Sequence, residues 1–376
     1  MLKYIATLCI TAFLPLTASA QIEARQELQE TVSATVLEIV SVEQKEILGT
    51  DTIVTIQEVR AEVHEGLRAG TVVTFENELT TLTEGDKVLL NRLAAINGEE
   101  YFVFKDVHRL PLLALLAVLF VALLIVFAGT QGVRALLSLG ASIAAILFGL
   151  IPALLAGYDP VLTSLAIASV ILAVVLFGTH GFNARATTAF LGTTAAVAIT
   201  SGIALLFVSA MRLTGFSSDA SIYLNFATFG SLDFAGLLLG SIIIGILGVL
   251  DDVSITQASV VQELKAANNT LSHLELYKRA IRVGRDHVGS LVNTLALAYV
   301  GVSLPLVLLY ANAGSDLMLT LNQEIVAAEL TRIMVGSIGL ILAVPLTTLI
   351  AAWWFGRKDV IVLDGDIPHH CGHHHH

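Results

Sequence analysis

The sequence PLLALLAVLFVALLIVFAG occupies residues 111–129 and carries no charged side chain. An α-helix needs about 20 consecutive apolar residues to cross the hydrocarbon core of a bilayer. Further apolar runs of this kind follow at residues 135–156, 161–178, 187–210, 234–250, 288–310 and 333–355. Residues 111–356 are therefore predicted to form an α-helical polytopic membrane bundle of about seven transmembrane helices.

The composition of the whole chain is that of a membrane protein. Hydrophobic residues make up 55% of the 376 positions and charged residues only 14%, whereas soluble domains carry about 25% charged residues. The net charge of -11 argues against nucleic acid as a partner, because phosphate binding needs clustered Lys and Arg. The lipid bilayer is the expected partner, and a homo-oligomer or a partner subunit stays open.

The first twenty residues have the pattern of a secretory signal peptide. Lys3 gives the segment a charged start, an apolar run follows, and Ala18-Ser19-Ala20 supplies the small residues of a cleavage site. We expect residues 1–20 to be removed and the mature chain to begin near Gln21. The alternative is an uncleaved first membrane anchor. In both cases the segment that follows is exported.

Residues 21–109 alternate between polar and apolar residues, which is the period of a β-strand. Strands are predicted at residues 35–40, 53–63, 71–76, 87–93 and 101–107. Turn residues separate them, and Asn97-Gly98 is the strongest hairpin signal. The segment is predicted to be a small all-β domain, an OB or SH3-like barrel or a sandwich. Its excess of acidic residues allows a cationic ligand.

The loop charges predict an orientation, because cytoplasmic loops carry an excess of Lys and Arg. With the β domain outside, the cytoplasmic loops hold Arg134, Arg185, a basic stretch, and Arg357 with Lys358. The opposite loops are mainly acidic, with Arg212 as the exception; they hold Asp159, Asp219, Asp233, Asp316, Glu324 and Glu329. An extracytoplasmic β domain, a cytoplasmic amphipathic segment at residues 251–285 and a cytoplasmic C-terminus are predicted.

The polar residues of the bundle concentrate between residues 248 and 309. An apolar helix meets two adjacent carboxylates in Asp251-Asp252-Val253-Ser254. After the amphipathic segment come the motifs Gly284-Arg285-Asp286, Asn293-Thr294-Leu295, Ala298-Tyr299-Val300-Gly301 and Ser303-Leu304-Pro305. These motifs, and the order of an exported domain before a helical bundle, resemble the YibE/F family of bacterial membrane proteins.

The resemblance implies a multi-pass protein of the bacterial plasma membrane, of the permease kind. It implies no substrate, because the family has no settled activity to carry over.

Two polar faces are predicted on the helices around this region, since residues three, four and seven apart share a helix face. Asp252 and Thr256 lie on one face, and Asp286 and Asn293 lie on another. If the helices pack together, these faces could meet and hold a cation, relay a proton or form an ion-paired gate. The candidate pathway residues are Asp251, Asp252, Thr256, Arg285, Asp286 and Asn293.

The competing interpretation is that these residues cap helix ends or obey the cytoplasmic charge bias. It is the favoured one for Lys278, Arg279 and Arg282. For Asp252, Asp286 and Asn293 the functional interpretation is favoured, because polar groups near lipid depth are costly unless they are paired.

The tail at residues 357–376 is rich in histidine. His369, His370, Cys371 and His373 have the side chains that bind zinc, nickel or copper. A native metal-binding tail, a low-complexity end without a role and a cloning remnant are the three interpretations. No other cofactor is expected.

Two functions fit the sequence. The first is a permease, transporter or channel for a small solute or ion. The alternative is a non-transporting scaffold or sensor whose exported β domain binds a ligand or partner. The sequence contains no Gly-x-Ser-x-Gly, no His-Glu-x-x-His and no phosphate-binding glycine loop, so no enzyme activity and no catalytic residue are predicted.

Overall fold

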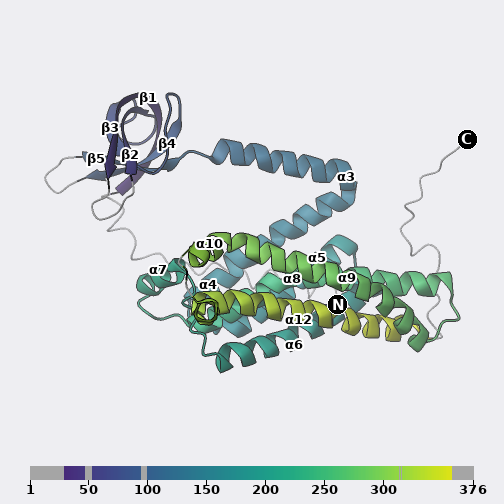
Figure 1. Cartoon of the computed structure of the whole chain (residues 1–376). Helices are drawn as coiled ribbons and strands as arrows, with labels where there is room; N and C mark the ends of the chain where they lie inside the picture. The colour runs from purple at the N-terminus through teal and green to yellow at the C-terminus, as the bar shows by residue number, and fades with distance from the viewer. Residues whose placement is uncertain (1–28, 47–52, 95–99, 313, 315, 358–376) are drawn as a thin grey trace, which may run out of the picture. The chain divides into compact units, whose positions relative to one another are not determined.

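The computed structural model describes residues 29–46, 53–94, 100–312, 314 and 316–357 (Figure 1). The proposed signal peptide, the Asn97-Gly98 turn and residues 358–376 of the histidine-rich tail lie outside the described residues. The chain divides into two compact units, Met1–Phe120 and Val121–His376. We call them the β unit and the helical unit.

The β unit is a five-stranded antiparallel sheet in the order β3-β2-β1-β4-β5. Its strands are β1 (Gln29–Glu46), β2 (Ile53–Val63), β3 (Val72–Asn77), β4 (Lys87–Ala94) and β5 (Glu100–Val107). Strand β1 is much longer than expected because it pairs with β4 through its first part and with β2 through its second. Register shifts after Val36 and Ile39 interrupt the pairing of β1 with β2. The result is a half-barrel.

The core of the β unit follows the two-residue period of the strands, because successive side chains point to opposite faces of a sheet. Val32, Ala34 and Val36 of β1 are buried, as are Val59 and Ala61 of β2. The Phe75 ring of β3 stacks on the Phe104 ring of β5 with centroids 6.1 Å apart. Strands β3 and β5 are not hydrogen-bonded to each other, so side chains join these two edges of the half-barrel.

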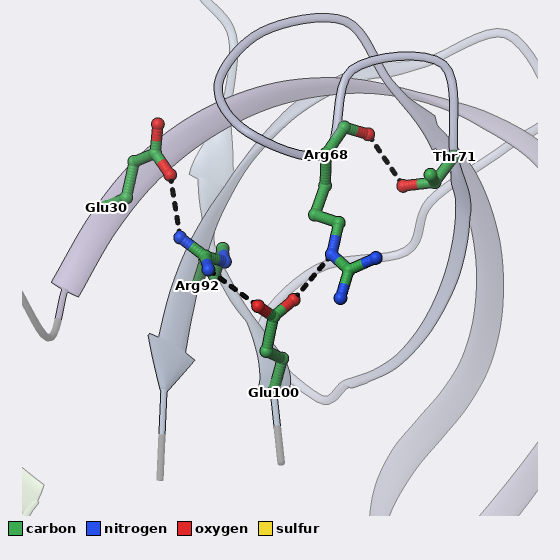
Figure 2. A network of polar contacts seen from close by, with 5 residues as sticks. All are labelled: Glu30, Arg68, Thr71, Arg92 and Glu100. Atoms are coloured by element: carbon green, nitrogen blue, oxygen red, sulfur yellow. Dashed lines mark hydrogen bonds and ion pairs between the residues drawn. The ribbon is translucent and has the colours of Figure 1, made fainter. Parts of the chain in front are cut away.

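A network of charged residues lies beyond the apolar positions at one end of β1 (Figure 2). The Arg92 guanidinium donates to Glu30 Oε2 at 3.1 Å and to Glu100 Oε1 at 2.6 Å. Arg68 Nε, from the turn between β2 and β3, donates to Glu100 Oε2 at 2.8 Å. The hydrogen bonds from Arg92 and Arg68 lower the pKa of Glu100 to about 2. We call these four residues the ionic clasp.

The helical unit consists of long helices joined by short ones. Its elements are α3 (Leu110–Ala145), which begins in the β unit, the π-helical turn η1 (Ile146–Leu150), α4 (Ile151–Leu155), α5 (Pro160–His180), α6 (Ala184–Ala210), α7 (Asp219–Ala227), α8 (Phe234–Ala267), α9 (His273–Val302), α10 (Leu304–Asn312), α11 (Leu317–Asn322) and α12 (Glu324–Phe355). Side chains cap several helix starts. Asp159, Asn183 and Asp233 accept hydrogen bonds at the starts of α5, α6 and α8, and Ser272 forms a capping box with Glu275 in α9.

Five helical segments in the described residues are long and apolar enough to cross a membrane, or six if α9 and α10 form one span bent by 66°. The expected count of seven is not confirmed. The first two expected helices form one segment, Leu110–Leu155, of 46 residues. It contains a break at Gly129, whose φ of 56° and ψ of -132° are not helical. Glycine adopts this positive φ without the steric cost of a Cβ atom.

Helices α6, α8 and α12 pack together, and α9 packs against α8 and α12 (Figure 1). Glycines permit the close crossings. Gly192 of α6 lies against Thr347 of α12, and Gly240 of α8 lies against Ser164 of α5. Such small residues allow helix backbones to approach closely in a membrane, where hydrophobicity does not drive helices together.

Candidate functional site

Two of the predicted pathway residues line a small hollow between α8, α9 and α12. Asp252 and Thr256 of α8 form part of its wall, one helical turn apart. We call this hollow the carboxylate pocket; its volume is about 150 Å³, and it is lined by Asp252, Val253, Thr256, Gln257, Gly284, His287, Leu291 and Val344.

Gly284 sets the geometry of this pocket. A Cβ atom at position 284 would overlap Cγ1 of Val344 in α12 and would lie 2.8 Å from Oε1 of Gln257 in α8. The Gln257 side chain is itself held, because its Nε2 donates to the carbonyl oxygen of Ala280 at 2.9 Å. The glycine of the Gly284-Arg285-Asp286 motif therefore serves the packing of three helices around the pocket.

Asp251 and Asp252 point in different directions, since adjacent residues are about 100° apart around a helix. Asp251 is only 7% exposed, and its Oδ1 accepts a hydrogen bond from the Asp252 amide at 2.9 Å. Neither carboxylate has an ion-pair partner among the described residues. Two adjacent acidic groups of α8 thus lack a neutralising ion pair within the described part of the chain.

The other predicted residues lie elsewhere. Arg285, Asp286 and Asn293 are exposed on the face of α9 that does not pack against α8 or α12. The packed face of α9 holds Ala280, Gly284, Val288, Leu291 and Leu295. The prediction that two polar faces meet is therefore wrong. The face of α8 that carries Asp252 contacts Gly284 and His287 of α9, whereas Asp286 and Asn293 lie on the opposite, exposed face of α9.

His287 and Gln257 are pocket residues that the sequence analysis missed. A signal for them was present, because small and apolar residues recur at positions 280, 284, 288, 291 and 295 with helical spacing. That repeat marks the packed face of α9, and His287 lies one turn after Gly284 on its border.

A second polar cluster involves α8, α9 and α12 and lies nearer the start of α8. Arg332 of α12 contacts Glu329 Oε1 at 2.5 Å, and its Nη2 donates to Ser241 Oγ of α8 at 3.2 Å. Glu329 and Tyr299 of α9 line a hollow of about 350 Å³, and Arg332 and Ser241 line another of about 230 Å³. We call Ser241, Tyr299, Glu329 and Arg332 the ion-pair cluster.

This cluster is not predicted from the sequence, because the last apolar run begins only at residue 333. Glu329 is therefore expected in a loop, whereas α12 begins at Glu324. The three-residue spacing of Glu329 and Arg332 is that of an ion pair within one helix and could have revealed it.

An apolar layer separates the two polar sites. Gly336 of α12 faces Ile246 of α8 and Leu295 of α9; a methyl group on Gly336 would lie 3.0 Å from Ile246 Cγ2 and 3.2 Å from Leu295 Cδ2. Ile246 is fully buried and Leu295 is 7% exposed. At 1.5 Å per residue, Ile246 lies about 8 Å along α8 from Ser241 and about 9 Å from Asp252. Along α8, α9 and α12 the carboxylate pocket, the apolar layer and the ion-pair cluster therefore follow one another, and we call them the three levels of these helices.

The described residues contain no group of three or more His, Cys, Asp or Glu side chains that could hold a metal ion. The metal ligands predicted in the tail, His369, His370, Cys371 and His373, lie outside this part of the chain.

A family model described as YibE/F-like protein matches residues 116–357, a range that includes α8, α9 and α12 entirely. No curated protein and no solved structure matches the chain. With this match over more than half of its residues and several helices that can span a bilayer, the chain is a membrane protein that belongs to the YibE/F-like family.

Proposed function

We propose that this protein is a transporter or channel that carries a small cation, the proton included, between α8, α9 and α12. The observation that supports the proposal is the sequence of levels along these helices: the carboxylate pocket, the apolar layer and the ion-pair cluster. A pathway that is wet at both ends and closed by an apolar constriction is a common design for gating.

The cargo is inferred from charge and size. A carboxylate near lipid depth is costly unless it binds a proton or a cation, and Asp251 and Asp252 have no basic partner among the described residues. The carboxylate pocket of about 150 Å³ has room for a few water molecules at about 30 Å³ each. That volume suits an ion with part of its hydration shell.

The proposed topology has seven spans in the bacterial plasma membrane, with the β unit outside and the C-terminus in the cytoplasm. Two considerations support it. A helix of 46 residues would be about 69 Å long at 1.5 Å per residue, more than twice the thickness of the hydrocarbon core, so the break at Gly129 would separate two spans. The positive charges of alternate loops supply the direction.

The proposal is tested by flux measurements on the full-length protein in proteoliposomes. Vesicles loaded with a pH-sensitive dye, or with dyes for monovalent and divalent cations, report movement of each ion. We expect flux with the native protein and a loss of at least about tenfold in the Asp252→Asn and Glu329→Gln variants, because each removes a charge from one polar level.

Asp286→Asn is the matched control, since it makes the same chemical change on the exposed face of α9. We expect it to keep native flux. Native protein that moves neither protons nor any cation in the panel contradicts the proposal, and so does full flux in both the Asp252→Asn and Glu329→Gln variants.

A second function, a scaffold or sensor, is favoured by one observation: the β unit has a hollow of its own, of about 920 Å³. Binding of a ligand to the full-length protein together with the absence of any flux would favour this function over transport.

A further inference from the structure

The two edge strands of the half-barrel lie side by side and leave a seam between them. In the described residues β3 forms a ladder only with β2, and β5 only with β4, although β3 and β5 contact each other. The stacked rings of Phe75 and Phe104 hold the strands together from the barrel interior. Strand edges of this kind carry main-chain groups that can pair with another chain.

A hollow of about 920 Å³ follows this seam. Its lining includes every residue from Val73 to Leu79 along the β3 side and from Glu100 to Phe104 along the β5 side. At about 3.3 Å per residue the β3 side is roughly 20 Å long. The hollow is therefore elongated along the strands, as an extended polypeptide is, rather than rounded around one small molecule.

The two faces of the seam differ in chemistry. Phe75 and Phe104 are buried and Phe102 is half-buried, so the side toward the barrel interior is apolar. The carboxylates of Glu58, Glu76 and Glu78 line the same hollow.

These three carboxylates have no ion-pair partner among the described residues. Glu58 of β2 and Glu76 of β3 are directly opposite in the sheet register, and like charges in that position destabilise a strand pair. A cation placed beside them would remove this repulsion. The charge pattern thus calls for a basic partner, which adds to the argument from the open edges and from the shape of the hollow.

We propose that the seam between β3 and β5 binds an extended basic peptide segment, in which Lys or Arg alternates with apolar residues, as an added strand on the edge of β3. Main-chain hydrogen bonds to β3 supply the affinity of such strand addition, and side-chain pockets supply its specificity. Alternate side chains of the added strand point to opposite faces. One set then covers the aromatic floor, and the other places ammonium or guanidinium groups next to Glu58, Glu76 and Glu78.

The proposal is tested with the full-length protein in lipid nanodiscs and a fluorescent peptide, Val-Lys-Val-Lys-Val-Lys-Val, followed by fluorescence anisotropy. We expect saturable binding that weakens as salt is raised. The double variant Glu76→Gln and Glu78→Gln should weaken binding on the order of tenfold, since it removes two exposed ion pairs. The double variant Glu43→Gln and Glu46→Gln changes the net charge equally on exposed positions of β1 and should bind as the native protein does.

Two further measurements separate a peptide strand from other occupants. A peptide of the same sequence with N-methyl groups on alternate residues cannot complete a ladder, so its binding should be lost. Tetramethylammonium at millimolar concentration should not displace the native peptide. Unaltered binding of the methylated peptide, displacement by tetramethylammonium, or equal binding of Val-Glu-Val-Glu-Val-Glu-Val would each overturn the proposal.

Discussion

The structural role of Gly284 differs from the role that its sequence motif suggests. In the sequence it is part of a charged motif, and the neighbouring Arg285 and Asp286 attract the functional interpretation. In the structure those two side chains are exposed, whereas Gly284 is buried where α9 crosses α8 and α12. Because Gly284 has no side chain, α9 can pack closely against α8 and α12, and position 284 forms part of the wall of the carboxylate pocket.

Replacement of Gly284 by alanine should destabilise the helical unit. Alanine has the higher helix propensity by about 1 kcal/mol, but its methyl group would overlap Val344, whose β-branched side chain has little rotamer freedom in a helix. Overpacking of this kind costs roughly 1–3 kcal/mol. We expect a lower midpoint in thermal unfolding of the detergent-solubilised protein.

Gly289 provides the matched control, because it lies in the same helix and nothing is within 4 Å of the position of its missing Cβ atom. Gly289→Ala should unfold at the native temperature or above it. Equal unfolding temperatures for the two alanine variants would show that Gly284 is not a packing residue.

At the scale of elements, long-range pairing alters both lengths and ends. Strand β1 extends from Gln29 to Glu46 because it serves two partners, which a local pattern of alternation cannot reveal. Helix α8 continues to Ala267, well beyond the end of its apolar run at residue 250. This continuity is what places Asp251 and Asp252 within a helix rather than at its end.

The ionic clasp joins β1, β4, β5 and the turn before β3, and it makes the β unit sensitive to acid. The folded pKa of Glu100, about 2, is below its ordinary value of 4.5. The clasp therefore stabilises the fold fully above about pH 4.5 and loses its contribution as the pH falls toward 2. Protection of the β4 and β5 amides from hydrogen exchange, corrected for intrinsic rates, should decline over this window.

Glu100→Gln should reduce this protection at pH 7 and should flatten its dependence on pH below 4.5, since glutamine does not titrate. Glu43→Gln, which changes an exposed glutamate of β1, is the control and should keep the native profile. A native profile in the Glu100→Gln variant would mean that the clasp contributes nothing to folding.

At the scale of the molecule, function is proposed to arise from the order of polar and apolar levels between three helices. The residues involved come from positions as far apart as Ser241 and Val344. Each polar level alone resembles an ordinary structural cluster. The apolar layer of Ile246, Leu295 and Gly336 between them is what suggests a gated pathway.

The apolar layer should become leaky when it is made polar. Ile246→Thr keeps a β-branched shape but adds a hydroxyl group that can hold water at the constriction. In the proteoliposome assay we expect faster passive ion flux than with the native protein. Leu297→Thr, at a position 62% exposed on α9, is the control and should not change the flux. An unchanged leak in Ile246→Thr would argue that the pathway does not pass through this layer.

The sequence by itself determined the apolar runs long enough to span a bilayer, the approximate position of every strand, and the family, because each depends on local composition, local periodicity or short motifs. It also predicted that Asp252 and Thr256 lie together at the candidate site. Only the tertiary structure decided which face of α9 is packed, that Arg332 reaches Ser241, and that β3 and β5 meet at an open seam. Those features depend on the rotation of each helix about its axis and on contacts between residues far apart in the chain. The free energy of such contacts comes from the packing of two segments against each other, so it cannot be read from the sequence of either segment alone.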